Sequence, residues 1–176
     1  MTMRQSALLI EVPEAEPSVA RWRAVHDPIA SRGIPAHITV LFPFMDPAAL
    51  EHESLEQIAA VTRSVVPFEF TLTELGEFPG CLWLRPIPEE PFQRTTAALH
   101  RVFPAHALYG GKFSENQPHL TVAQTSSNEE FRNLRTEVDD ALGSALPINC
   151  VAEAVSLFTS DTTGMWRRHT RFAFEG

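Results

Sequence analysis

The stretch Ile34 to Phe44, IPAHITVLFPF, places a histidine and a threonine inside a run of otherwise apolar residues. His37 and Thr39 alternate with Ile38 and Val40, and a period of two is typical of a β-strand. Since successive side chains of a strand point to opposite faces, the aliphatic residues share one face and the imidazole and hydroxyl share the other. The stretch therefore predicts a strand with a core face and a face that can perform chemistry.

The same pattern occurs a second time, as HLTV, at His119 to Val122. A half-buried histidine on its own is more often a hydrogen-bonded core residue than a functional one. Two copies with matching threonines are improbable by chance in a chain of 176 residues with 7 histidines. We therefore interpret His37, Thr39, His119 and Thr121 as one polar site to which two facing strands contribute.

Segments of strand and helix character alternate along the rest of the chain. The expected strands are 6–12, 37–42, 66–75, 81–85, 119–123, 147–158 and 165–174. The expected helices are 17–30, a segment from an Asp46 cap and Pro47 to Ala59, 89–103, and 127–142 with its Ser127 and Glu130 capping box. Short turns between neighbouring strands require antiparallel pairing, so an α+β fold fits better than a doubly wound parallel sheet. The order of elements around the two His-x-Thr strands also suggests a duplicated, two-lobed unit.

Composition limits the classes of protein that remain. A length of 176 residues is typical of one domain, so we expect residues 1–176 to form a single two-lobed unit that acts as a monomer. The net charge of −8 argues against binding duplex DNA, which needs a basic surface, but leaves small or single-stranded phosphate ligands open. Cys81 and Cys150 have no metal-site spacing and are interpreted as reduced thiols. The apolar run ALLIEV is too short to cross a membrane, and a cytoplasmic location is expected.

The histidines do not have the spacing of a metal site. Neither His37 nor His119 has a second histidine or a carboxylate at ligand spacing, so zinc or iron binding is not expected. Proton transfer is the other common use of imidazole, because its unperturbed pKa lies near 6.5. Two imidazoles across a cleft can supply a base and an acid to the same reaction.

The paired motifs each follow a proline-containing loop, in IPAHITVLFPF and ENQPHLTVAQT, and they resemble the two-histidine phosphoesterase superfamily, in particular its 2′-5′ RNA ligase branch. The stretches CLWLRPIPEEPF and YGGKFSENQPHLTVA, and the closing strand that contains a tryptophan, follow the order of that family. The resemblance implies an α+β, bilobal fold. Two antiparallel-sheet lobes with pseudo-twofold symmetry would surround a central cleft, with helices on the outside and no cofactor.

The activity that this resemblance implies is the opening of a cyclic phosphodiester, such as the 2′,3′-cyclic phosphate of a small nucleotide or an RNA end, with reversible 2′-5′ RNA ligation as the related reaction. By position, His37 corresponds to the general acid and His119 to the base that activates water. Thr39 and Thr121 correspond to the residues that contact phosphate. Hydroxyl donors placed there would stabilise the charge that develops on the phosphoryl oxygens.

Further substrate contacts are expected from two regions. Trp83 and Arg85 share one face of a strand, where Trp83 could stack on a base and Arg85 could contact a phosphate. An equally good interpretation is that both side chains are exposed to solvent at the edge of a sheet. Tyr109, Lys112 and Phe113 lie on the glycine-rich loop before the second motif and could cover the cleft. The alternative function is a nucleotide-binding module that keeps the cleft but does not turn over its ligand.

Overall fold

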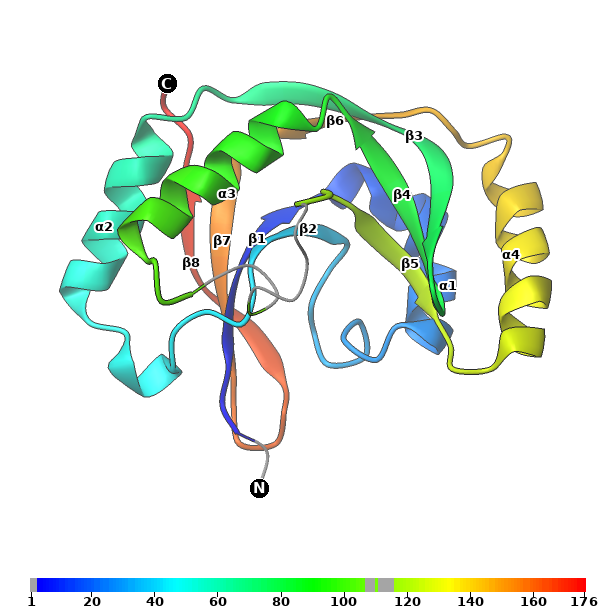
Figure 1. Ribbon diagram of the computed structural model, residues 1–176, viewed down its shortest axis with the longest axis horizontal. Helices are drawn as coiled ribbons and strands as arrows, with labels where there is room; N and C mark the ends of the chain where they lie inside the picture. The colour runs from blue at the N-terminus through cyan, green and yellow to red at the C-terminus, as the bar shows by residue number, and fades with distance from the viewer. Residues whose placement is uncertain (1–2, 107–109, 111–115) are drawn as a thin grey trace.

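The computed structural model describes residues 3–106, 110 and 116–176. It contains an eight-stranded sheet in the order β6-β3-β4-β5-β2-β1-β7-β8, with antiparallel neighbours throughout (Figure 1). The strands are β1 (Ser6–Glu11), β2 (His37–Leu41), β3 (Phe68–Phe78), β4 (Cys81–Ile87), β5 (Leu120–Gln124), β6 (Ile148–Ala152), β7 (Ala154–Ser160) and β8 (Trp166–Ala173). The helices are α1 (Glu16–His26), α2 (His52–Arg63), α3 (Glu90–Val102) and α4 (Asn128–Leu142), with short 3-10 turns η1 (Pro13–Ala15) and η2 (Pro47–Ala49).

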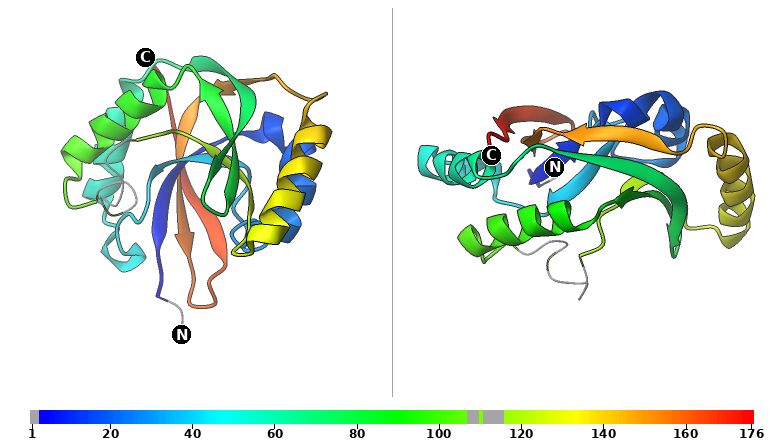
Figure 2. Two further views of the ribbon diagram at one scale, coloured as in Figure 1. Left: turned by 45° about the vertical axis from the view of Figure 1, so that its right-hand side comes forward. Right: turned by 90° about the horizontal axis from the view of Figure 1, so that it is seen from above.

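The α+β prediction is confirmed, and the two predicted lobes are two four-stranded halves of this sheet. One half is β6-β3-β4-β5 and the other is β2-β1-β7-β8, so the two motif strands β5 and β2 meet in the middle. The helices lie in two pairs on either side, α2 with α3 and α1 with α4 (Figures 1 and 2). Each helix that precedes a motif strand packs on the other motif strand, α1 on β5 and α3 on β2.

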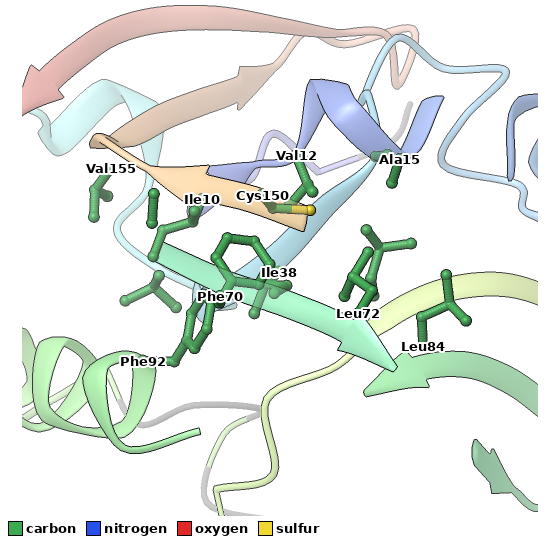
Figure 3. Packing of buried hydrophobic residues seen from close by; sticks show 14 of the residues in the cluster. Ile10, Val12, Ala15, Ile38, Phe70, Leu72, Leu84, Phe92, Cys150 and Val155 are labelled. Carbon is green, nitrogen blue, oxygen red and sulfur yellow. The ribbon is translucent and has the colours of Figure 1, made fainter. Parts of the chain in front are cut away.

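The alternation that the sequence showed in the motif strands is present in the fold. Ile38 and Val40 of β2, and Leu120 and Val122 of β5, are buried in the main core. Figure 3 shows Ile38 near Phe70 of β3 and Phe92 of α3, and the rings of Phe70 and Phe92 meet edge to face with centroids 5.0 Å apart. Burial of aliphatic side chains at about 25 cal/mol per Å2 of apolar surface holds this face in place and turns the histidines to the opposite face.

The predicted strand 147–158 is wrong as a single element. Glu153 separates β6, which pairs with β3, from β7, which pairs with β1. These partners lie in different halves of the sheet, yet one residue connects β6 to β7. The sheet must therefore be strongly curved, as the view from above in Figure 2 shows.

The predicted cap at Asp46 exists, but it does not begin the long helix. The Asp46 carboxylate accepts a hydrogen bond from the Ala48 amide, 2.8 Å between Oδ1 and N, and this opens η2. Leu50 then adopts an extended backbone conformation, so α2 begins only at His52. Among the residues that the structure describes, no helix is both long and apolar enough to cross a membrane.

Candidate active site

The two motifs line one pocket, with a volume of about 280 Å3, at the junction of the two halves. His37 and Thr39 contribute from β2, Thr121 from β5 and His119 from the position just before β5. A larger hollow of about 810 Å3 lies between the end of α2 and α3, but it contains neither motif. The sequence therefore predicted residues that the fold brings into one cavity.

The register of β2 against β5 explains how four side chains converge. Ile38 is paired with Leu120 in an antiparallel ladder, and both side chains point into the core. This pair brings the two motifs side by side at the centre of the sheet, with the histidines and threonines on the face opposite the core.

Both imidazoles are held by a backbone carbonyl two residues earlier in the chain. The Nδ1 atom of His37 lies 2.8 Å from the Pro35 carbonyl oxygen, and the Nδ1 atom of His119 lies 2.9 Å from the Gln117 carbonyl oxygen. A carbonyl can only accept, so Nδ1 carries the hydrogen in each ring. This fixes the neutral tautomer in which Nε2 is the basic nitrogen.

The protein environment disfavours the charged form of both rings. Burial lowers the pKa of His37 from 6.5 to about 4, and the nearby Arg23 cation and His119 act in the same direction, against the Pro35 carbonyl and Asp27. Part of the His37 surface still borders the pocket, but the protein atoms around the ring exclude enough water to disfavour its charged form. Burial also lowers the pKa of His119, opposed by the Gln117 carbonyl.

An aromatic pair lies against His119. The rings of Phe78 and Trp83 stack with centroids 4.9 Å apart, and their centroids lie 5.2 Å and 5.9 Å from that of His119. Trp83 is only 6% exposed, and its ring covers Gly76, where a Cβ atom would come within 2.5 Å of the indole. The structure thus places Trp83 as a packing partner of His119, and its stacking on a base stays a prediction.

The other predicted substrate contacts lie either away from the pocket or outside the described residues. Arg85 forms ion pairs with Glu89, 2.8 Å, and Glu74, 3.2 Å, and does not line the cavity. Tyr109, Lys112 and Phe113 lie outside the described residues. The roles of all five residues therefore stay predictions.

Several pocket residues were not predicted from the sequence to belong to the site. Asp27, Cys81 and Gln124 line the polar part of the cavity. The Cys81 thiol forms a hydrogen bond with Thr121, and burial raises the pKa of the thiol, so it stays protonated. The apolar part includes Phe42 and Trp166, whose ring centroids are 6.2 Å apart. The sequence indicated Phe42 and Trp166 only indirectly, because Phe42 lies within the first motif stretch and Trp166 lies in the closing strand.

A catalytic arrangement based on a metal would need several ligands close together. Within residues 3–106, 110 and 116–176, no three His, Cys, Asp or Glu side chains gather closely enough to hold a metal ion. The polar groups that line the pocket are two imidazoles, two hydroxyls, one thiol, one carboxylate and one amide.

A curved α+β sheet with a His-x-Thr motif on each central strand is the architecture of a two-histidine phosphoesterase. The sequence matches the family described as the 2′-5′ RNA ligase superfamily over residues 11–164. The chain therefore belongs to the 2′-5′ RNA ligase superfamily, whose members are phosphoesterase-type and RNA ligase-type enzymes.

Solved structures show the same fold at low identity. LigT from E. coli in complex with NADP+ is 18% identical over 100% of both chains, with a TM-score of 0.61. LigT in complex with 3′-AMP is 16% identical over 98% of this chain and 99% of that chain, with a TM-score of 0.60. The protein TT0787 of Thermus thermophilus is 18% identical over 98% of both chains, with a TM-score of 0.63. A search of curated proteins found no significant match.

Proposed function

We propose that this protein is a metal-independent phosphoesterase that opens a cyclic phosphodiester, such as the 2′,3′-cyclic phosphate of a nucleotide or of an RNA end. The observation that carries the proposal is the convergence of His37, Thr39, His119 and Thr121 in one pocket. Membership of the 2′-5′ RNA ligase superfamily supports phosphoester chemistry at that place.

The reaction needs two proton transfers on opposite sides of phosphorus. One imidazole accepts a proton from water at Nε2 while the water oxygen forms a bond to phosphorus. The bond from phosphorus to one ribose oxygen breaks, and the other imidazole gives that oxygen a proton, which leaves a phosphate monoester. Thr39 and Thr121 donate hydrogen bonds to the phosphoryl oxygens, where negative charge increases in the transition state. If a ribose hydroxyl replaced water as the nucleophile, the same proton transfers would carry out the related 2′-5′ ligation.

A substrate about the size of one nucleotide fits the pocket. A volume of about 280 Å3 lies at the lower end of the range for small-molecule sites. Phe42 and Trp166 at the apolar end provide surface for a sugar or base, while the motif residues hold the phosphate. LigT, which has the same fold, has been crystallised with 3′-AMP, ATP and NADP+, and these ligands support a nucleotide-sized substrate here.

The test is a screen of 2′,3′-cyclic mononucleotides and of oligonucleotides that end in a cyclic phosphate, run with EDTA. We expect a monoester product, identified by 31P NMR and chromatography. We also expect the purified protein to be a monomer, so that light scattering gives the mass of one chain. Binding by calorimetry without any product would instead establish a non-catalytic nucleotide-binding module. Loss of turnover in EDTA that added metal restores would contradict metal independence.

A further inference from the structure

The hollow of about 810 Å3 between the end of α2 and α3, here called the α2–α3 hollow, contains none of the motif residues. The two helices form one of the two helix pairs of the molecule (Figures 1 and 2). The segment that follows α2 gives the hollow an apolar floor, lined by Val65, Val66, Pro67 and Phe68. Val66 is 65% exposed, so this floor is open to solvent. Contiguous apolar surface that stays exposed on a folded protein marks places where other molecules bind.

The wall that α3 contributes combines small apolar side chains with cations. Arg94 and Arg101 line it, and both are exposed. Ala97 and Ala98, which lie between them in the sequence, line the same wall. His100 also lines the hollow, and its Nδ1 atom is buried with no hydrogen-bond partner among the described residues. The wall therefore offers an apolar strip that positive charge borders.

The charge of the hollow is opposite to that of the whole chain. The chain has 22 acidic and 14 basic side chains and a net charge of −8, but no Asp or Glu is among the described residues that line the hollow. Arg94 and Arg101 form no ion pair with any residue that the structure describes. Arginines that do form ion pairs are Arg23, Arg85, Arg135, Arg168 and Arg171. Cations beside an open apolar floor are complementary to a ligand that is both acidic and apolar.

The spacing of the two arginines favours a helical ligand. Arg94 and Arg101 are seven residues apart in α3, which is close to two helical turns. Their side chains therefore leave the same side of the helix, about 10.5 Å apart along its axis. A second helix that lies along α3 matches both when its own carboxylates are seven residues apart. Its aliphatic residues between these carboxylates then face the floor, as in other grooves that bind amphipathic helices.

A nucleic acid fits the same hollow less well. Sites for single strands combine a basic groove with aromatic rings on which bases stack. Phe68 is the aromatic side chain of the described lining, and its ring packs against those of Phe92 and Phe174, with centroids 5.0 Å and 6.1 Å apart. The rest of the floor is aliphatic. The hollow therefore favours side chains such as leucine over bases.

We propose that the α2–α3 hollow is a docking site for an amphipathic helix of a partner protein. Aliphatic side chains of that helix fill the apolar floor, and two acidic residues seven positions apart pair with Arg94 and Arg101. The hollow is separate from the catalytic pocket, so this inference goes beyond the proposed function and does not depend on it.

The test uses the full chain and a fluorescent synthetic helix as the probe. The probe has leucines on one face and two glutamates seven residues apart beside them, and a control peptide of the same composition has its two glutamates on the opposite face. We expect fluorescence anisotropy to show saturable binding of the probe, weaker binding of the control peptide, and a loss of affinity as salt screens the charges. In NMR spectra, the amide signals of Val66 and Ala97 should shift on binding, while those of His37 should not.

Variants of the hollow separate its charge from its floor. Arg94→Gln together with Arg101→Gln should weaken binding about fivefold or more, since each exposed ion pair contributes a modest free energy. Val66→Ser removes apolar surface and should also weaken binding. Arg132→Gln, at an exposed arginine of α4, is the matched control and should bind as the wild type does. Circular dichroism verifies that each variant is folded.

An exchange of charges tests for direct contact. Arg94→Glu together with Arg101→Glu should lose the glutamate probe and bind a peptide with lysines at the same two positions. Failure of the wild type to bind the glutamate probe, or binding that the arginine variants do not weaken, would overturn the proposal. Tighter binding of a single-stranded oligoribonucleotide at the same arginines would overturn it in favour of nucleic acid. A dimer in light scattering that Arg94→Gln and Arg101→Gln abolish would overturn it in favour of a second copy of this chain.

Discussion

The half that carries His37 and the half that carries His119 use the same backbone plan with different side chains. Each motif strand follows a helix, and each imidazole is held by the carbonyl two residues before it. The surroundings then diverge, because a buried Arg23 to Asp27 ion pair lies on one side and a stack of Phe78 and Trp83 lies on the other. A repeated fold can therefore provide two similar groups, while residues outside the repeated motif give each group different surroundings.

Removal of either imidazole should have the largest effect. His37→Asn and His119→Asn each remove a group that transfers a proton, and we expect turnover of a cyclic phosphate to fall by about 10^2- to 10^4-fold. Asparagine keeps a polar side chain, so circular dichroism and binding of a nucleotide monophosphate should change little. His52→Asn, on the exposed start of α2, is the matched control and should keep full activity. Full activity in either motif variant would refute the two-histidine mechanism.

The threonines should show a smaller loss, and one that is similar in the two halves. Thr39→Val and Thr121→Val remove a hydroxyl donor but keep the branched shape, so kcat should fall by about 10^2-fold. Thr39→Ser and Thr121→Ser retain the hydroxyl and should recover much of the rate. Steady-state kinetics on the best substrate of the screen provides the measurement. A change in KM alone would show that the hydroxyls bind the ground state and do not stabilise developing charge.

Gly76→Ala should disturb the His119 half alone. Its Cβ atom would lie 2.5 Å from the Trp83 ring, so the indole has to move away from its place beside His119. Overpacking of this kind destabilises a protein by about 1–3 kcal/mol, and we expect a lower melting temperature together with a roughly tenfold lower kcat. Trp83→Phe fills less of the same space and serves as a milder change at the same contact. If the NMR signal of the His119 imidazole were unchanged in Gly76→Ala, the packing role of Trp83 would be contradicted.

The pH dependence of stability should reflect the burial of His37. Folding lowers the pKa of His37 from 6.5 to about 4, so between these values the unfolded chain binds more protons than the folded one. The contribution of neutral His37 is therefore complete above pH 6.5 and is lost as the pH falls toward 4, by at most about 3 kcal/mol. Urea unfolding at pH 7 and pH 4.5 should show a larger decrease for the wild-type protein than for His37→Asn. Equal decreases would show that His37 is not buried in its neutral form.

The sequence was sufficient for the parts of the fold that follow local patterns. The His-x-Thr strands, the antiparallel pairing across short turns and the α+β class follow from alternation and from turn residues, which act over a few neighbouring positions. The division of 147–158 at Glu153 depends on which distant strand accepts each hydrogen bond, and no local pattern records that choice. The main features of the site were predictable because the motif occurs twice.

The residues around the motifs were harder to predict for a physical reason. Arg23 and Asp27 are four positions apart, the spacing of an ordinary surface ion pair on a helix, but both are buried in the fold. Trp83 and Arg85 alternate as ligand contacts would, yet Trp83 packs on Gly76 and Phe78 across the hairpin and on the distant His119. Burial and long-range partners depend on the whole fold, so periodicity alone cannot reveal them.

The packing of each helix on the motif strand of the other half has a consequence for cooperativity. Since α1 covers β5 and α3 covers β2, neither half can unfold locally without exposing apolar side chains of its counterpart. We expect the amides of β2 and β5 to exchange with solvent at one common rate, as a single unfolding unit. The two histidines would then lose their alignment in the same event, so a partly unfolded chain would not retain half of a working site.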